Sequence, residues 1–340
     1  MLNITKFKKN KRYLLACSGG VDSIALYNLL KENEIDFDVA SINYNFREQS
    51  KLEINNVKEL CKKDDKKLHL YENTKSISTN MEKEARDIRY NYFDKLMLKY
   101  NYEALLTGHN LNDKVEWFLM QFTKGAGVKE LTGMNLESER NSYKTLKPLI
   151  ETERTDIEKY IEDNNLISFY DESNSDLTYH PTDNPQGIRR NYFRHNFAAK
   201  LTKEFKNGIR KSFDILEKEA EEMNEYQIEK VEDKVIVITL QNKKETNMLR
   251  AIDFVLKRDF THLLNGGQRK EIVKQQEKGI VINDISIGFY DNKILITPYI
   301  SSGSYSFSKE EKENFRKMKV PAKNRKYLLE NKIKLNLKEK

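Results

Sequence analysis

The 340-residue sequence has little cysteine and no long apolar run. Its two cysteines, Cys17 and Cys61, form no C-x-x-C pair, which argues against a disulfide framework and against a metal site built from cysteines. No apolar stretch approaches the length of a membrane span. The basic start of the chain leads into an apolar segment, 13–16, that is too short for a secretion signal. These absences predict a soluble cytoplasmic protein that makes no membrane contact.

Charge is balanced along the chain except at one end. The formal net charge is +7, and residues 301–340 supply all of it, with 12 Lys or Arg against 5 Glu. A basic end on a neutral body predicts contact with a polyanion such as nucleic acid. A solvated, lysine-rich terminus has the same composition and remains an alternative.

Strand-like and helix-like stretches alternate in the first half of the chain. Short apolar runs predict strands at 13–16, 37–44, 67–71 and 104–107. Helices are expected between them, around 50–64 and 81–100. This alternation is typical of βαβ units and predicts an α/β fold, a parallel sheet with helices on both faces.

The rest of the chain predicts a different organisation. We expect a first domain over 1–200 and a highly charged helical connector over 201–230. A smaller α+β domain over 231–300 and a basic tail over 301–340 are predicted to follow.

The hexapeptide Ser18-Gly19-Gly20-Val21-Asp22-Ser23 joins the first predicted strand to the first predicted helix. Adjacent glycines permit positive φ and let a ligand reach backbone N–H groups, and a helix start favours an anion. An ordinary turn with Asp22 or Ser23 as the N-cap is the alternative. The chain contains no G-x-x-x-x-G-K-[ST] pattern, so a phosphate loop here is not a Walker A motif. Ligands of parallel sheets bind outside the carboxyl ends of the strands, where this loop and the stretches after 44 and 107 are expected.

The loop resembles the pyrophosphate loop of the N-type ATP pyrophosphatases, which cleave ATP between the α- and β-phosphates and activate a carbonyl oxygen as an adenylate. Further blocks resemble, in order, those of the tRNA(Ile)-lysidine synthase family: 84–90 (EARDIRY), 108–116 (GHNLNDKVE), 124–134 (KGAGVKELTGM), Lys147-Pro148-Leu149 with Arg154 and Ile157, and Asp171-x-Ser173-Asn174-x-Asp176 with Arg190-Asn191-x-x-Arg194. The ordered blocks cover residues 14–196, and the resemblance is weaker beyond about residue 215.

The resemblance implies a Rossmann-like N-type ATP pyrophosphatase fold and an ATP-dependent ligase. Such an enzyme joins free L-lysine to C2 of the wobble cytidine of tRNA(Ile) (CAU anticodon), through an adenylated cytidine, and releases AMP and pyrophosphate. It implies that ATP is bound by Ser18, Gly19, Gly20, Val21, Asp22, Ser23, Arg86, His109 and Arg190, with Mg²⁺ held at Asp22. The resemblance implies that Asp22, Asp113 and Glu116 are catalytic and that Asp113 and Glu116 bind lysine. Contacts to tRNA fall to Arg194, Lys317, Lys319, Lys323, Arg325 and Lys326.

Each of these residues also has a structural interpretation. Arg86 and Arg89 fit an exposed helix face, and His109 fits a helix cap. Asp113 and Glu116 fall on one helical face and could be solvated, and Arg190 and Arg194 could form a surface stripe.

Three departures from the family pattern stand out. Asn112 replaces the first of two usual acidic residues, and Tyr44 replaces a usual histidine before Asn45-Phe46-Arg47. The segment 177–189 is longer than the usual spacing and is expected to be an inserted loop.

Other functions remain open at this stage, as do monomer and homodimer. A tRNA thiolase of the same superfamily would use a C-x-x-C pair or a late catalytic cysteine, and none follows Cys61. A pyrophosphatase acting on a small molecule would not need the basic tail. An RNA-binding module with an inactive loop would not need Asp22, Asp113 and Glu116.

Overall fold

The computed structural model describes residues 1–44, 48–73, 81–140, 143–170, 176–183, 188–222, 225–301, 307–335 and 337. The chain divides into two compact units, Met1–Lys218 and Glu219–Lys340. No helix within the described ranges is long and apolar enough to span a bilayer.

The first unit is built on a mixed sheet. Among the described residues its strands are β1 (Tyr13–Ala16), β2 (Phe37–Asn43), β3 (Leu68–Glu72), β4 (Ala104–Leu106), β5 (Glu137–Arg140) and β6 (Tyr143–Leu146). Their order is β3-β2-β1-β4-β6-β5, and all neighbours are parallel except β5, which runs antiparallel to β6 at the edge. The predicted α/β fold is confirmed, whereas the β5–β6 pair was not predicted.

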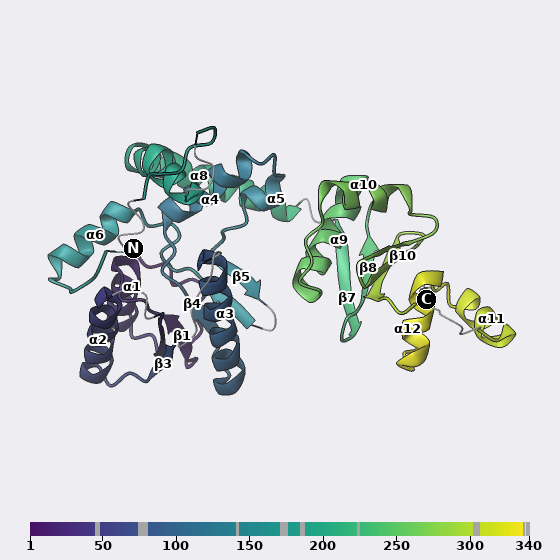
Figure 1. Ribbon diagram of the computed structural model, residues 1–340, viewed down its shortest axis with the longest axis horizontal. Coiled ribbons are helices and arrows are strands. Elements are labelled where there is room, and N and C mark those ends of the chain that lie inside the picture. The colour runs from purple at the N-terminus through teal and green to yellow at the C-terminus, as the bar shows by residue number, and fades with distance from the viewer. Residues whose placement is uncertain are drawn as a thin grey trace. The chain divides into compact units, whose positions relative to one another are not determined.

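Alternate residues of the strands feed two apolar layers. Leu15 and Val39 pack with α1 (Val21–Glu32), α2 (Glu48–Lys63) and α6 (Arg154–Asp163) on one face. Leu14 and Ala40 pack with α3 (Met81–Tyr100) on the other face. Figure 1 shows α1 and α2 on one side of this sheet and α3 on the other. Each fully buried leucine contributes about 1.5–3 kcal/mol, so both layers stabilise the unit, and helices on both faces are confirmed.

A cap of helices lies beyond the carboxyl ends of the strands (Figure 1). It comprises α4 (Leu111–Phe122), α5 (Val128–Leu131), α7 (Arg189–Phe193), a π-helical turn (Arg194–Ala198) and α8 (Ala199–Glu222). Val115 packs against Ala198 and Phe213, and the buried Lys114 forms an ion pair with Glu217 of α8. These contacts fix α4 against the π-helical turn and α8, over the edge where ligands of parallel sheets bind.

The second unit is the predicted α+β structure. In the described ranges an antiparallel sheet has the order β7-β8-β11-β10-β9. The strands are β7 (Tyr226–Glu232), β8 (Val235–Leu240), β9 (Ile280–Ile282), β10 (Ile285–Tyr290) and β11 (Lys293–Pro298). Helices α9 (Glu245–Asp259) and α10 (Gly266–Lys274) cover one face. The connector expected over 201–230 is helical only as far as Glu222, and strand β7 begins at Tyr226.

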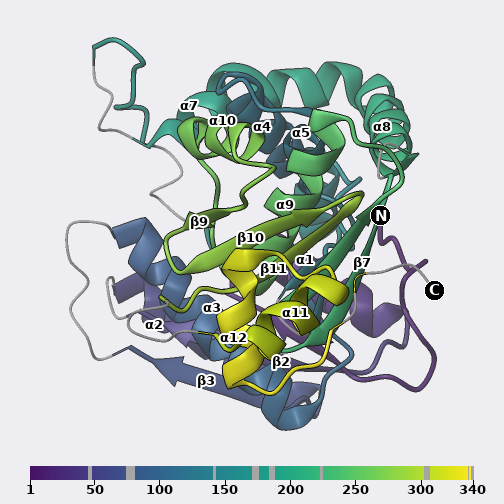
Figure 2. The ribbon, with the colours of Figure 1, turned by 90° about the vertical axis from the view of Figure 1, so that its right-hand side faces the viewer.

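The expectation of a separate basic tail over 301–340 is wrong. Helices α11 (Lys309–Lys317) and α12 (Arg325–Glu330) lie against the other face of the second sheet (Figure 2). Val320, Leu328 and Leu337 are buried against strand residues of β8 and β11. Gly288 makes room for this segment, since a Cβ there would lie 2.3 Å from the Cβ of Pro321. Charge dominates the composition of the segment, but spaced apolar residues determine its position.

Candidate active site

A cavity of about 380 Å³ opens at the carboxyl ends of β1, β2 and β4. It brings together residues from four of the motif blocks recognised in the sequence: Ser18, Gly20, Asp22 and Ser23; Arg89 and Tyr90; Gly108, His109 and Asp113; and Arg190 and Arg194. Tyr44 and residues of α2, including Glu53, complete the wall. The predicted ligand-binding edge therefore holds a hollow whose lining includes eight of the predicted site residues.

The loop between β1 and α1 presents an open helix start. Gly19 has a φ of +85°, and Gly20 is the N-cap of α1, where no side chain of the described chain caps the helix. Ser23 Oγ donates a hydrogen bond to the Gly20 carbonyl at 2.9 Å, so the serine hydroxyl folds the loop instead of capping the helix. Val21 is buried and can offer only its backbone N–H. An uncapped helix start of this kind attracts an anion, and the alternative of a turn capped by Asp22 or Ser23 is wrong.

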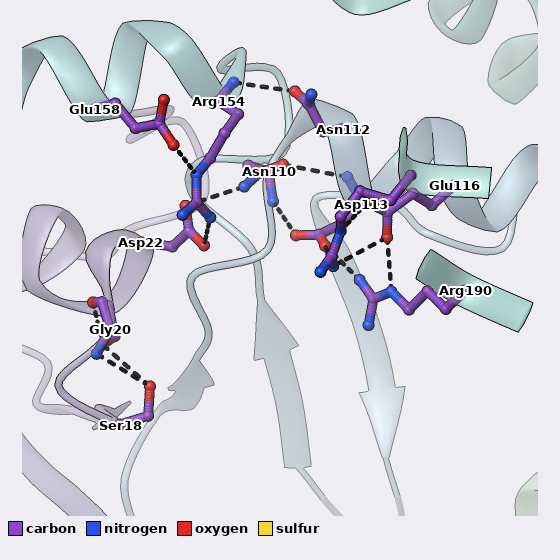
Figure 3. Close-up of polar contacts among 12 residues, drawn as sticks. Ser18, Gly20, Asp22, Asn110, Asn112, Asp113, Glu116, Arg154, Glu158 and Arg190 are labelled. Atoms are coloured by element: carbon purple, nitrogen blue, oxygen red, sulfur yellow. Dashed lines mark hydrogen bonds and ion pairs between the residues drawn. The ribbon is translucent and has the colours of Figure 1, made fainter. Parts of the chain in front are cut away.

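Asp22 is held from two sides at the first turn of α1 (Figure 3). Its Oδ1 accepts a hydrogen bond from the Asn110 amide at 3.0 Å, and its Oδ2 pairs with Arg154 Nη1 at 2.6 Å. Burial raises the pKa of Asp22 to about 6 although Arg154 opposes the shift. A half-buried carboxylate paired with Arg154 therefore lies beside the open helix start.

Arg154 is itself fixed by two partners. Its Nε donates to Glu158 at 2.9 Å, and its backbone N–H donates to Asn112 Oδ1 at 3.0 Å (Figure 3). The amide of Asn112 thus binds the first N–H of α6, which an aspartate could do equally well. The departure at Asn112 leaves this structural contact intact.

His109 follows the end of β4 and lies on the cavity wall. Its Nδ1 is 2.8 Å from Thr107 Oγ1, which fixes the orientation of the ring. Burial lowers the pKa of His109 to about 4, since the neighbouring carboxylate of Asp113 offsets burial only in part. The ring is neutral at pH 7 and can form hydrogen bonds but does not supply positive charge.

The predicted carboxylates and the predicted arginines bind each other (Figure 3). Arg190 Nε lies 2.6 Å from Glu116 Oε2, and its Nη2 contacts Asp113 Oδ1. Arg194 Nε lies 2.7 Å from Glu116 Oε1. Glu116 is almost fully buried, and Arg190 holds the pKa of Asp113 below its usual value even though burial acts in the opposite direction. The alternatives of solvated carboxylates at Asp113 and Glu116 and of a surface stripe at Arg190 and Arg194 are therefore wrong, because these side chains pair with one another.

Comparison with known proteins identifies the family. Residues 1–201 match the model of the PP-loop domain, an ATP-binding family. The chain is 34% identical over 326 residues to a tRNA(Ile)-lysidine synthase of Campylobacter jejuni, covering 96% of this chain and 94% of that protein. It is 32% identical over 313 residues to the tRNA(Ile)-lysidine synthase of Helicobacter pylori, covering 92% of this chain and 88% of that protein. The chain belongs to the tRNA(Ile)-lysidine synthase family. The resemblance read from the motifs is confirmed.

Three residues that the family motifs suggested for ATP are not among those that line the cavity: Gly19, Val21 and Arg86. Arg86 is exposed on α3, with its guanidinium 4.8 Å from the centre of the Tyr90 ring. Arg89, one turn along the helix, lines the cavity instead, and its Nε donates to the Tyr44 hydroxyl at 3.1 Å. The Tyr44 hydroxyl in turn donates to the Ala85 carbonyl at 3.0 Å, so the tyrosine that replaces the family histidine ties β2 to α3.

Some candidate residues lie elsewhere. Asn45-Phe46-Arg47, Asp171, Ser173 and Asn174 fall outside the described residues, as does 184–187 of the inserted segment. The candidates for tRNA contact other than Arg194 belong to the second unit. There Lys317, Lys319 and Lys323 are exposed, whereas Arg325 Nε donates to the Val320 carbonyl at 2.9 Å and Lys326 donates to the Ser301 carbonyl.

Two functional contacts were missed in the sequence. Asn110 begins α4 in a capping box with Asp113, whose Oδ2 accepts the Asn110 backbone N–H at 2.9 Å. The spacing of an Asn and an acidic residue three positions on is the signal that could have found it. Arg154 was noted only as part of a family block, and its pairing with Asp22, 132 residues away, has no local signal.

The residues around Asp22 fit a bound Mg²⁺. The part of the chain that the structure describes has no group of three or more His, Cys, Asp or Glu side chains able to hold a metal. Mg²⁺ commonly uses one or two carboxylates and takes its other ligands from phosphates and water, so a single carboxylate beside a phosphate site suffices. Arg154 is the cationic group on Asp22 in this structure.

Proposed function

We propose that this chain ligates free L-lysine to C2 of the wobble cytidine of tRNA(Ile), in two steps at the cavity described above. In the first step the C2 oxygen of the cytidine attacks the α-phosphate of ATP, and pyrophosphate leaves. In the second step the lysine ε-amine attacks C2, the C2–O bond breaks, and AMP leaves with the oxygen. The observation that carries this proposal is the meeting, in one cavity, of an open helix start, Asp22, and the group formed by Asp113, Arg190 and Arg194.

The open start of α1 is assigned to the pyrophosphate. Backbone N–H groups at Gly20 and beyond, with the hydroxyl of Ser18, can stabilise the leaving group without supplying a nucleophile, while Ser23 shapes the loop through its hydrogen bond to the Gly20 carbonyl. Asp22 would hold Mg²⁺, which neutralises phosphate charge when it is bound. Because His109 is neutral, the positive charge that faces the phosphates has to come from arginine, and Arg190 is the assigned residue.

The carboxylates are assigned to lysine. An ammonium group is attracted by Asp113 and Glu116, and the amine has to lose a proton before it attacks C2. A carboxylate that binds the ammonium can accept that proton.

The substrate nucleotide has to enter the cavity. A single-stranded anticodon base can be turned out without melting a duplex. The exposed lysines of the second unit, Lys317, Lys319 and Lys323, are assigned to phosphates of the tRNA.

The alternative of a tRNA thiolase is disfavoured because both cysteines are buried. Cys61 is buried in the core of the first unit. Cys17 borders the cavity but is 2% exposed, and burial raises the pKa of its thiol. Protonated, buried thiols are poor nucleophiles.

The test is mass analysis of nucleosides from a tRNA(Ile) transcript incubated with the protein, ATP and isotopically labelled lysine. We expect the cytidine at the wobble position to gain the labelled lysine, and a transcript with uridine at that position to gain none. Release of pyrophosphate with no lysine on the tRNA would contradict the proposal and favour a pyrophosphatase with another acceptor. Incorporation of sulfur from a sulfide donor would favour a thiolase.

A further inference from the structure

Four charged side chains form a cluster of ion pairs at the start of α4. Asp113 and Glu116 carry two negative charges, and Arg190 and Arg194 carry two positive charges. Glu116 lies between both guanidinium groups, at 2.6 and 2.7 Å. The cluster as a whole is neutral, so it attracts a further cation only weakly.

The two oxygens of Asp113 have different surroundings. Oδ2 accepts the Asn110 backbone N–H at 2.9 Å and fastens the start of α4. Oδ1 contacts Arg190, and Arg194 Nη2 lies 3.9 Å from the same oxygen; Asp113 and both arginines line the cavity. Oδ1 is therefore the oxygen that a ligand in the cavity could reach, and Arg190 is the nearer of the two arginines that cover it.

The two arginines also differ. The side chain of Arg190 is 36% exposed and that of Arg194 is 23% exposed, while that of Glu116 is 2% exposed. Arg190 thus has more freedom to turn toward a ligand in the cavity. Arg194 can stay on Glu116 when Arg190 leaves, so that buried carboxylate keeps a partner.

We propose that Arg190 is an exchangeable counter-ion that closes the lysine subsite until nucleotide binds. A nucleotide phosphate draws its guanidinium away from Asp113, and Oδ1 of Asp113 then accepts the lysine ammonium. Of the two carboxylates assigned to lysine under the proposed function, Asp113 is thus the one that meets the ammonium directly, and Glu116 is a positioning residue that retains Arg194. This inference rests on the proposed function, in which lysine and nucleotide share the cavity.

The exchange links the two ligands thermodynamically. Nucleotide raises the affinity for lysine, and lysine raises the affinity for nucleotide by the same factor. Charge-assisted pairs are exchanged one for one, so we expect a coupling on the order of tenfold or more. The linkage also keeps the amine out of the site before a phosphate occupies it.

The experiment is calorimetric titration of L-lysine into the full-length chain. One titration uses the protein alone, and the other uses protein saturated with Mg²⁺ and the ATP analogue that carries a methylene group between the α- and β-phosphates. We expect the lysine Kd to be at least about tenfold lower with the analogue. In Arg190→Met the nucleotide-free protein should bind lysine more tightly than the unmodified chain does, and the coupling should fall toward one.

Arg189→Met is the matched control. Arg189 is the neighbouring residue of α7, but its Nη2 donates to Thr123 Oγ1 at 2.8 Å. It does not line the cavity, so this variant should keep the full coupling. Arg190→Lys is a second variant that keeps one charge and should retain part of the coupling, and tryptophan fluorescence verifies that each variant is folded.

Equal lysine affinity with and without the analogue would overturn the exchange, as would full coupling in Arg190→Met. Failure to bind lysine in the presence of the analogue would overturn it too. These outcomes are separate from failure of the proposed function, because the nucleoside assay detects the lysine product without reference to coupling.

Discussion

The most direct stability test of the phosphate loop replaces its first glycine. Gly19→Ala meets two separate obstacles in the structure. Gly19 has a φ of +85°, in the left-handed region where a side chain is strained. Its Cβ would also lie 3.0 Å from Glu53 Cβ, 3.1 Å from Glu53 O and 3.2 Å from Glu53 Cα. The neighbouring atoms are backbone and Cβ of α2, so rotation of the Glu53 side chain cannot relieve the contact.

The two obstacles have different magnitudes. Left-handed backbone at a residue with a Cβ costs about 1–2 kcal/mol. Forcing an extra carbon into a packed site costs about a further 1–3 kcal/mol. Gly19→Ala should therefore lower the free energy of unfolding of the first unit by about 2–5 kcal/mol, the sum of both.

Gly125→Ala separates the two contributions. Gly125 has a φ of +73°, but no atom lies within 4 Å of the position its Cβ would take. This variant should show the backbone cost alone, about 1–2 kcal/mol.

The assay can follow the first unit by itself. The chain contains one tryptophan, Trp117 in α4 of that unit, whose indole N–H donates to the Glu130 carbonyl at 2.8 Å. Urea unfolding followed by tryptophan fluorescence gives the midpoint and slope for both glycine variants and the unmodified chain. If the two variants lose equal stability, the close contact between the loop and α2 is not present in solution and the reasoning fails.

Further predictions concern charge. Asp22→Asn should abolish pyrophosphate release while the circular dichroism spectrum is unchanged; near-normal turnover would remove Asp22 from the metal and phosphate site. Because the folded-state pKa of His109, about 4, lies below its ordinary 6.5, the first unit binds fewer protons than its unfolded chain and loses stability as pH falls from 7 toward 4. His109→Gln should reduce the loss between pH 7 and 5 by up to about 2 kcal/mol, and an unchanged loss in urea titrations at the two pH values would contradict this. Lys319→Gln and Lys323→Gln should each lower the slope of log tRNA affinity against log salt by roughly 0.7–0.9, whereas unchanged slopes would mean that these exposed lysines are only solvated.

The first half of the fold was predictable because its signals are local. The strand Tyr13–Ala16 and the helix Met81–Tyr100 have the predicted bounds, since a short apolar run and a helical period are properties of neighbouring residues. The β5–β6 pair gave no such signal. Glu137–Arg140 is polar throughout and half-exposed, and it forms a strand only because β6 lies beside it.

In the last 40 residues the strong charge signal concealed a weaker signal, the few apolar residues that pack against the second sheet. Their positive charge predicted a free tail, but three apolar residues, Val320, Leu328 and Leu337, lie far enough apart to escape a periodicity test. The space they fill depends on Gly288, which is distant in sequence. Removing the whole segment would expose the sheet, so the role of its charge has to be tested by single substitutions at exposed lysines.

Candidate site residues were found by motif, but their partners were not. The sequence placed Asp113 and Glu116 on one helical face and assigned both to lysine. In the structure Asp113 caps its own helix with one oxygen and contacts Arg190 with the other, whereas Glu116 is buried between two arginines. A spacing of three residues places two side chains on the same helix face, but it does not say how deeply each is buried. Burial decides whether a carboxylate can contact a ligand or only hold other residues in place. The two acidic residues of one motif therefore lie at different depths, Asp113 at the cavity wall and Glu116 behind it.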